Sequence, residues 1–322
     1  MNPAKAPKPV GEPPSREEIG VDVSKAFLDS FQAGSQKRIP NSTTEIRRWL
    51  RALAATGPVR VSAEATGCYT RELVGVCLDL GIPISLLNPR NVRSFAKAKG
   101  QLAKTDKIDA RLIAEYASAF DPPALDEGWP ARDELRQLHC RLQQLIASRA
   151  KRRTSLEQYH SKTIRAEVKR EIVALSKRIE TYQATIDEMI RSCQLQQRRE
   201  IMEKTIGIGA ATSATLLIHL PELGQLNRRE AAALAGLAPM NRDSGAGRGR
   251  RTIQAGRSEP RKALYMAALT AAHRNPDFMS FYSRLRDQGK PVKVCLVAVA
   301  RKLLIQINSN LKNLPQQPLT NT

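Results

Sequence analysis

The spacing of apolar residues in the middle of the chain constrains the fold more than any other feature. From residue 172 to residue 193, apolar side chains recur at alternating intervals of three and four residues: Ile172, Leu175, Ile179, Tyr182, Ile186, Met189 and Cys193. An earlier stretch has the same intervals: Leu135, Leu138, Leu142 and Leu145. Only a helix places such positions on one face, so the pattern predicts a coiled coil or a helical hairpin. We therefore expect a helical connector over residues 127–200, and its apolar seam favours a homo-oligomer, a dimer or a tetramer.

The segment between the two apolar seams is strongly basic. Residues 148–170 read SRAKRRTSLEQYHSKTIRAEVKR. Such a run can be a solvated helix surface, or it can contact the phosphates of RNA or DNA. The sequence leaves both interpretations open.

Before the connector, short apolar runs alternate with helical patterns. Residues 19–33 read IGVDVSKAFLDSFQA, which predicts a hairpin around the Ser-Lys turn. A helix is expected after Ser42, because Ser42 and Glu45 have the spacing of a capping box. Strands are expected within residues 58–67 and 82–89, and helices over 69–81 and 105–120. This alternation indicates an α/β layer domain over residues 19–126, preceded by a disordered tail at residues 1–18.

The third region, residues 201–322, contains glycines at a predicted junction between helices. Residues 205–220 read TIGIGAATSATLLIHL, and Gly207 and Gly209 stand at the junction. Glycines there allow backbone N–H groups to face a phosphate at the start of the next helix, as in a helix-hairpin-helix element. Between residues 226 and 301 there are 15 Lys+Arg against 5 Asp+Glu. This region is therefore expected to bind mainly the sugar-phosphate backbone of nucleic acid.

The charge of the whole chain also indicates a polyanionic partner. Lys and Arg number 52 against 31 Asp and Glu, which gives a formal net charge of +21. Such an excess favours nucleic acid, and the absence of a long apolar stretch argues against a membrane. The five cysteines are widely scattered with no CxxC pair, so neither zinc nor a disulfide framework is indicated. A reducing bacterial cytoplasm, in association with the nucleoid, is the expected location.

Four acidic residues are candidates for a metal site. Asp22 interrupts the apolar first strand, Glu64 ends a later strand, and Asp106 and Asp109 share one face of a helix. Like charges that converge repel each other, and a divalent cation such as Mg²⁺, or alternatively Mn²⁺, would resolve the conflict. Other acids of this region are expected to be solvated: Asp29, Glu72 and Asp79.

A serine stands at the head of a run of glycines and arginines. Residues 241–257 read NRDSGAGRGRRTIQAGR, with Ser244 followed by Arg248, Arg250 and Arg251. Taken alone, the stretch resembles a flexible basic loop that binds nucleic acid. The alternative is a nucleophilic serine whose neighbouring arginines hold the non-bridging oxygens of a phosphate.

Several of these motifs together resemble the Asp-Glu-Asp-Asp insertion-sequence transposases of the IS110 family, which include Piv-type DNA invertases. The N-terminal resemblance lies in IGVDVSKAFLD, AEATGCY and KTDKIDARLIAEYA. The C-terminal resemblance lies in IGIGAATSATLLIHLPELGQLNRREAAALAGLAPMNRDSGAGRGRR. Together they cover nearly the whole chain from residue 19.

The resemblance implies a fold and an activity. The fold is a RuvC-like, RNase H-type N-terminal domain, a coiled-coil connector and a mostly helical C-terminal transposase domain. The implied site is a metal tetrad of Asp22, Glu64, Asp106 and Asp109, with Ser244 as the nucleophile. The implied partners are target DNA, donor DNA and a structured non-coding bridge RNA that guides recombination.

Two other functions remain open at this stage. The same tetrad could activate water in a metal-dependent, junction-cutting endonuclease, with Ser244 incidental. The chain could also bind RNA or DNA without catalysis, its acidic residues having a structural role.

Overall fold

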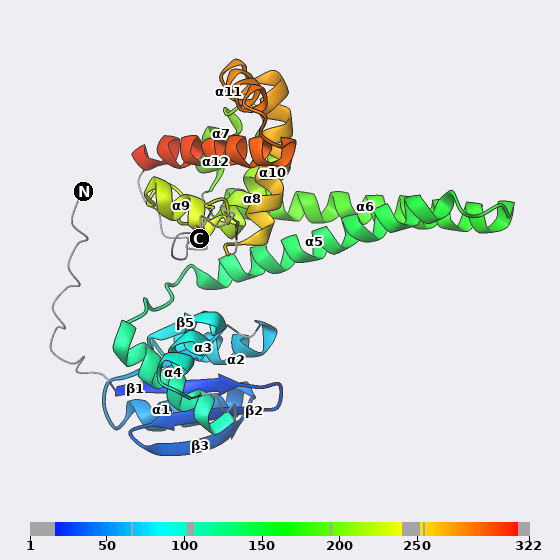
Figure 1. Cartoon of the computed structure of the whole chain (residues 1–322). Helices are drawn as coiled ribbons and strands as arrows, with labels where there is room; N and C mark the ends of the chain where they lie inside the picture. Colours follow the sequence, from blue (N-terminus) through cyan, green and yellow to red (C-terminus); the bar gives the residue numbers. More distant parts are fainter. Residues whose placement is uncertain are drawn as a thin grey trace, which may run out of the picture. The chain divides into compact units, whose positions relative to one another are not determined.

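The chain folds into two compact units, one ending at Glu127 and the other beginning at Gly128. The computed structural model describes residues 17–65, 67–101, 106–193, 195–239, 252–253 and 255–314, and for residues 106–108 it describes the backbone only. Figure 1 shows a sheet with helices in the first unit and helices alone in the second. The expectation of a mixed α/β N-terminal region followed by a mostly helical remainder is confirmed.

The first unit is built on a five-stranded sheet with the order β3-β2-β1-β4-β5. Its strands are β1 (Glu17–Val23), β2 (Phe27–Gln32), β3 (Ser35–Pro40), β4 (Val59–Glu64) and β5 (Ile84–Leu87). The first three strands pair antiparallel, whereas β4 runs parallel to β1 and β5 parallel to β4. The end of β1 lies beside the end of β4, because parallel neighbouring strands end at the same edge of a sheet.

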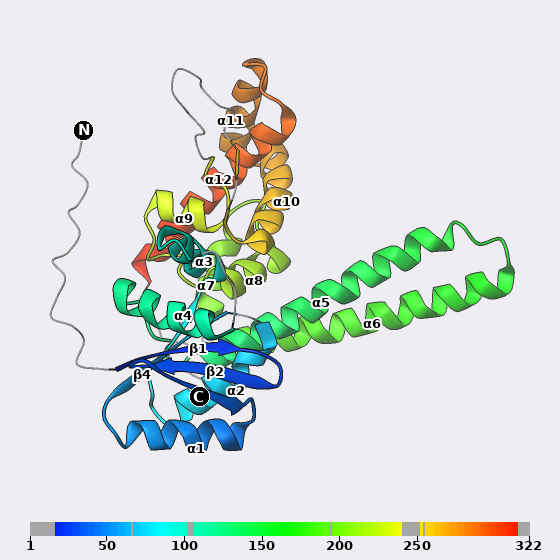
Figure 2. The same cartoon turned by 60° about the horizontal axis from the view of Figure 1, so that its bottom comes forward.

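Helices cover the two faces of this sheet. They are α1 (Thr43–Ala54), α2 (Arg71–Asp79), α3 (Pro89–Ala98) and α4 (Asp106–Phe120), and a short 3-10 turn, η1 (Gly67–Thr70), precedes α2. Helix α4 packs on β1, β2 and β4, and Figure 2 shows it on the face opposite α1. Ile19 and Val21 of β1 are fully buried, as expected for a strand enclosed between helices.

The local predictions for this unit are confirmed with three exceptions. The hairpin, the two parallel strands and the helices after residues 42, 70 and 105 are present. The capping box is wrong in detail: Ser42 is the N-cap of α1, but its side chain makes no capping bond, and Glu45 instead pairs with Arg48. The edge strand β3 and helix α3 were not predicted, since β3 buries only Ile39 and so lacks an apolar pattern.

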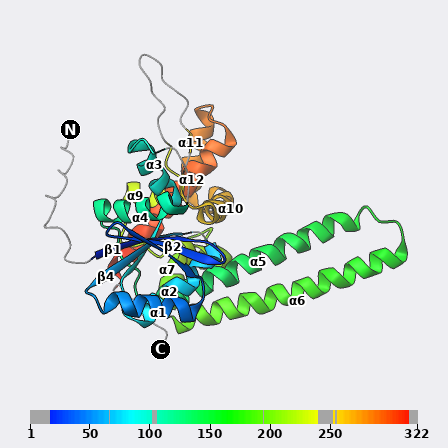
Figure 3. The same ribbon diagram turned by 90° about the horizontal axis from the view of Figure 1, so that it is seen from below.

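The second unit begins with a long helical hairpin. Helices α5 (Trp129–Leu156) and α6 (Lys162–Ser192) pack against each other along their length, as Figures 1 and 3 show. Leu135, Leu142 and Leu145 of α5 are buried in one cluster with Ile179 and Ile186 of α6. The two seams therefore cover each other within one chain, which is the hairpin alternative. A supercoil and pairing between subunits stay predictions.

The rest of this unit is a compact group of helices. They are α7 (Gln196–Glu203), α8 (Ala210–His219), α9 (Arg228–Leu234), α10 (Ser258–Arg274), α11 (Pro276–Asp287) and α12 (Val292–Asn310), and a 3-10 turn, η2 (Leu311–Asn313), follows. Helix α12 runs through the core, with Val299, Leu303 and Ile307 fully buried. These residues share one core cluster with the base of the hairpin. The division expected at residue 200 falls inside this unit and stays a prediction.

No helix in the described ranges is both long and apolar enough to cross a bilayer. Helix α6 is the longest, and its sequence is mostly charged and polar on the side away from the seam.

Two histidines join the hairpin to the helical group. His139 of α5 is buried, and its ring contacts that of His219 of α8 edge to face, with centroids 4.9 Å apart. His139 Nε2 lies 3.1 Å from the hydroxyl of Thr215 and 3.3 Å from the side-chain amide nitrogen of Gln143. His139 Nδ1 lies 3.0 Å from His219 Nε2, so the two rings share a hydrogen bond.

Burial lowers the pKa of both imidazoles, and that of His219 falls to about 4 because His139 and Arg136 add to the effect. In the unfolded chain the imidazoles return to a pKa of about 6.5. The unfolded chain therefore binds more protons between about pH 6.5 and pH 4, and the stability of the second unit falls as the pH drops through this window.

Replacing His219 with Gln should remove this part of the pH dependence. The free energy of unfolding of wild type should fall by on the order of 2 kcal/mol more than that of His219→Gln between neutral pH and about pH 4. Urea denaturation at the two pH values measures the difference, with the exposed His160→Gln as control. An equal pH dependence in wild type and His219→Gln would contradict the assignment.

Candidate active site

The predicted metal-binding acids lie at the ends of neighbouring elements of the first unit. Asp22 is the penultimate residue of β1, Glu64 is the last residue of β4, and Asp109 lies in the first turn of α4. All three side chains are partly buried. Asp106 begins α4, but its side chain lies outside the described residues.

A glycine in β1 allows α4 to approach the sheet. A Cβ at Gly20 would lie 2.1 Å from the carbonyl oxygen of Ala110 and 2.5 Å from the amide nitrogen of Ala114. Atoms cannot come that close, so only glycine permits this contact between strand and helix. Asp22 is two residues beyond Gly20 and therefore points to the face that α4 covers.

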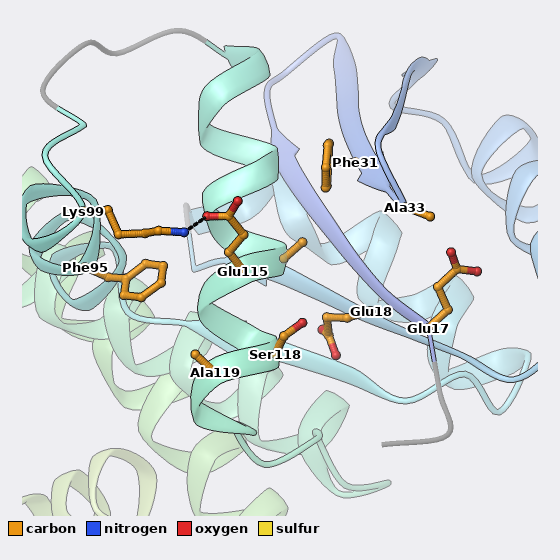
Figure 4. Close-up of a pocket in the computed structure, with 10 residues that line it drawn as sticks. Glu17, Glu18, Phe31, Ala33, Phe95, Lys99, Glu115, Ser118 and Ala119 are labelled. Carbon is orange, nitrogen blue, oxygen red and sulfur yellow. Dashed lines mark hydrogen bonds and ion pairs between the residues drawn. The ribbon is translucent and has the colours of Figure 1, made fainter. Parts of the chain in front are cut away.

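The direction of α4 brings its first turn to Asp22. The later residues of the helix, Glu115 and Ser118, line a hollow together with Glu17 and Glu18 at the start of β1 (Figure 4). The helix therefore runs opposite to β1, and its first turn lies toward the end of the strand. Asp109 directly precedes Ala110, so the fold carries Asp109 toward Asp22.

The strand register places Glu64 beside Asp22. Val21 is paired with Ala63 across the parallel β1–β4 ladder, so Asp22 and Glu64 follow as the next neighbours. Successive residues alternate between the faces of a sheet, and Ser62, two residues before Glu64, donates to Glu18 at 2.6 Å on the α4 face. Asp22, Glu64 and the first turn of α4 thus share one face of the sheet.

A further acid joins this row. Asp29 of β2 lies directly opposite Asp22 in the antiparallel register, and Arg38 of β3 lies opposite Asp29. The expectation that Asp29 is solvated is wrong, since its side chain is only 16% exposed and Arg38 binds both of its oxygens at 2.8 and 2.9 Å. The hairpin register could have revealed this residue, because a turn at residues 24–26 sets position 29 against position 22.

The oxygen atoms on this face suit a hard divalent cation. Mg²⁺ prefers carboxylate oxygens and water, and these acids offer no nitrogen or sulfur ligand. Among the described side chains, which leave out Asp106, no group of three or more His, Cys, Asp or Glu is close enough to hold a metal. The complete ligand set expected from the sequence includes Asp106 and stays a prediction.

A hollow of about 650 Å³ lies at the opposite end of β1 and is lined by Glu17, Glu18, Phe31, Phe95, Lys99 and Glu115 (Figure 4). Burial raises the pKa of Glu18, although Ser62 and Arg60 oppose the effect. Burial would also raise the pKa of Glu115, but hydrogen bonds from Lys99 and Arg111 bring it below its usual value. This acidic hollow does not include the predicted acids and is poorly suited to a phosphate.

The predicted phosphate-binding glycines differ in their surroundings. Gly207 has a φ of +101°, and a Cβ there would lie 2.9 Å from the carbonyl oxygen of Ala267. Packing of the turn against α10 therefore explains this glycine. Gly209 is the N-cap of α8 with no side-chain capping bond, and a Cβ there would meet nothing within 4 Å. Phosphate binding at either position stays a prediction.

The other predicted site residues belong to the second unit and lie outside the described residues. They are Ser244, Arg248, Arg250 and Arg251. Their roles stay predictions.

Two family models match the chain. One, the Asp-Glu-Asp-Asp model of IS110 described as "Transposase", covers residues 19–163, and the other, "Transposase IS116/IS110/IS902 family", covers residues 199–283. Fold and matches together define a transposase with an α/β N-terminal unit. The chain belongs to the IS116/IS110/IS902 family of transposases. Its class of activity is accordingly DNA transposition and recombination.

Curated relatives extend over nearly the whole chain. The chain is 27% identical to the pilin gene-inverting protein of Moraxella bovis over 311 residues, covering 90% of this chain and 94% of the relative. It is 23% identical to an uncharacterized 43.6 kDa protein of insertion element IS110 from Streptomyces coelicolor, covering 88% and 91%. A solved structure of T. thermophilus RuvC in complex with Holliday junction substrate matches 34% of this chain at 14% identity and a TM-score of 0.27. At this TM-score the fold assignment rests on the strand order and pairings of the sheet itself.

Replacing Gly20 with Ala should separate α4 from the sheet. We expect a loss of about 1–3 kcal/mol in the free energy of unfolding, because the new methyl group would overlap the backbone of α4. Urea denaturation measures this loss. The control is Gly75→Ala in α2, where a Cβ meets nothing within 4 Å, so stability should be unchanged or slightly increased. Equal stability of the two variants would show that the helix has room to move.

Proposed function

We propose that this chain is a Mg²⁺-dependent, RNA-guided recombinase that mobilises an insertion sequence and cuts and rejoins DNA strands through a phosphoserine intermediate. The observation that carries the proposal is the shared face of Asp22, Glu64 and the first turn of α4, in a chain of this transposase family. A mixed sheet on its own would support many functions, because function depends on the site and not on the fold.

The carboxylates form the first part of the proposed machinery. Asp22, Glu64, Asp106 and Asp109 would hold Mg²⁺, with Mn²⁺ as a substitute, since their oxygen atoms are the ligands these cations prefer. The bound ion would stabilise negative charge on the reacting phosphate. Asp29 stays outside this set, because Arg38 already neutralises it.

Ser244 forms the second part. Its oxygen would attack the phosphorus of a phosphodiester, forming an Oγ–P bond as the bond from phosphorus to one sugar oxygen breaks. The serine gives up its proton and the leaving sugar oxygen gains one. Attack by the hydroxyl of another strand reverses the step, so the ester conserves the bond energy and rejoining needs no high-energy cofactor. Arg248, Arg250 and Arg251 would bind the non-bridging oxygens.

The proposed partners are donor DNA, target DNA and a structured guide RNA. The net charge of +21 supports polyanionic partners, and the uncapped start of α8 at Gly209 leaves backbone N–H groups that suit a phosphate. Base pairing by the RNA would select the DNA site, so the protein itself would mainly contact backbones. We also propose that the protein acts as a homo-oligomer.

Alanine at any tetrad position should abolish strand exchange. For Asp22→Ala, Glu64→Ala, Asp106→Ala and Asp109→Ala we expect a loss of roughly 100-fold or more, with nucleic-acid affinity retained, because stabilisation of the transition-state charge is removed. Gel assays with Mg²⁺, and with chelator, measure the rate. The control is Asp79→Ala, an exposed acid paired with Arg47 on another face. Full activity in excess chelator would contradict the metal site.

The serine should form a covalent adduct with DNA. Wild type incubated with a nicked substrate and the cognate RNA is expected to give an adduct whose labelled peptide contains residue 244, and Ser244→Ala should give none. Denaturing gels and mass spectrometry make the measurement. Site selectivity should be lost when the RNA is left out.

The same assay separates the alternatives. Cleavage without an adduct would instead show a water-using endonuclease, and binding without cleavage would show a non-catalytic protein. An adduct that persists in Ser244→Ala would place the nucleophile elsewhere.

A further inference from the structure

Two glycines bring together the ends of the segment that carries Ser244. Gly236 follows α9 and Gly256 precedes α10. A Cβ at Gly256 would lie 2.2 Å from the amide nitrogen of Gly236, and a Cβ at Gly236 would lie 2.5 Å from the carbonyl oxygen of Ala255. The two backbones therefore cross in contact. The chain on either side of the segment that carries Ser244 is therefore joined at one place in the helical group.

Arg257 is held at this crossing by several bonds. Its backbone N–H donates to the carbonyl of Leu234 at 2.8 Å. Its guanidinium binds both carboxylate oxygens of Glu222 at 2.7 and 2.8 Å and the carbonyl of His219 at 2.6 Å. The positive charge of Arg257 thus has a fixed position beside the crossing.

The hairpin helix α5 contributes more positive charge at the same place. His139 is bonded to His219, whose carbonyl binds Arg257, so this part of α5 lies next to the crossing. Arg136 and Arg132 precede His139 by three and seven residues, so they share its face of the helix. Three arginines from α5 and the start of α10 therefore approach each other.

Arg136 has the carboxylates of Asp133 and Glu222 in its surroundings, but neither binds its guanidinium directly. Within the part of the chain that the structure describes, its half-buried guanidinium makes no hydrogen bond and no ion pair. The nearby carboxylate of Glu222 is occupied by Arg257, and that of Glu259 by Lys262. Burial lowers the pKa of Arg136, and the charges of Arg257 and Arg132 lower it further, whereas those of Asp133 and Glu222 oppose the effect. A partly desolvated cation among cations costs free energy unless an anion joins it.

We propose that Arg136, with Arg132 and Arg257 beside it, binds a phosphodiester group of a nucleic-acid strand next to the segment that carries Ser244. The planar guanidinium suits the paired oxygens of a phosphate. The proposal rests on the proposed function for its purpose, which is to hold a strand beside the joined ends of the segment that carries Ser244. It adds to that function a phosphate contact supplied by the base of the hairpin.

Binding of short fluorescent oligonucleotides tests the proposal, measured by anisotropy over a range of salt. Arg136→Gln should weaken binding roughly tenfold, because a hydrogen bond between charged groups is lost. The slope of log affinity against log salt should fall by about 0.9 on duplex DNA, or about 0.7 on a single strand. Arg136→Lys should keep most of the salt dependence. The control is Arg141→Gln, which removes an exposed arginine from the same helix.

Separate arms with duplex DNA, single-stranded DNA and RNA identify the strand. A loss confined to the DNA arms assigns the site to DNA, and a loss confined to RNA assigns it to the guide. Affinities and slopes equal to those of Arg141→Gln in every arm would overturn the proposal.

The melting temperature excludes a structural role. Arg136→Gln should melt at or above the temperature of Arg141→Gln, because it removes repulsion with Arg257 and Arg132. A clearly lower value would show that the guanidinium supports the fold and would overturn the proposal. Because binding is measured without chemistry, the two proposals can fail separately. If wild type forms no adduct but Arg136→Gln still binds more weakly than wild type, the serine mechanism is refuted and the phosphate site stands.

Discussion

The contact between α4 and β1 at Gly20 is the constraint on which the N-terminal site depends. Helix and strand backbones touch there with no room for a Cβ. The contact sets the height of α4 above the sheet, and the helix direction then decides that its first turn lies near Asp22. Parallel pairing of β1 and β4 brings Glu64 to the same place. Backbone packing thus places these carboxylates on one face of the sheet.

In the second unit, packing holds the long helical hairpin of α5 and α6 on a compact group of helices. Apolar residues of α5 and α6 cover each other, and the imidazoles of His139 and His219 join α5 to α8. The same contact places Arg136 beside Arg257, at the crossing of Gly236 and Gly256. One packing arrangement therefore supports the hairpin and places positive charge at the ends of the segment that carries Ser244.

Charge is distributed unevenly over the chain. In the first unit, acids lie on the α4 face of the sheet and in the hollow at the other end of β1. Most of these acids have partners, such as Arg38 for Asp29 and Lys99 for Glu115. Arg136 in the second unit is different, since its guanidinium makes no hydrogen bond or ion pair with a described residue. Unpaired positive charge is what a phosphate-binding surface requires, whereas paired acids mainly stabilise the fold.

The sequence by itself determined the elements with strong local patterns, which are the β-hairpin of β1 and β2 and the apolar seams of α5 and α6. It also contained the family motifs. It singled out candidate acids as well: Asp22 and Glu64, because an acid within or at the end of an apolar strand is conspicuous, and Asp109, because it shares a helix face with Asp106. Only the tertiary structure decided that the seams pair within one chain, that Asp29 joins the row, and that Arg136 meets Arg257. The physical reason is that periodicity and capping act over a few residues, whereas register and helix packing depend on partners far away in the chain. Gly20 illustrates the difference: any strand can contain a glycine, and only the helix above it makes that glycine necessary.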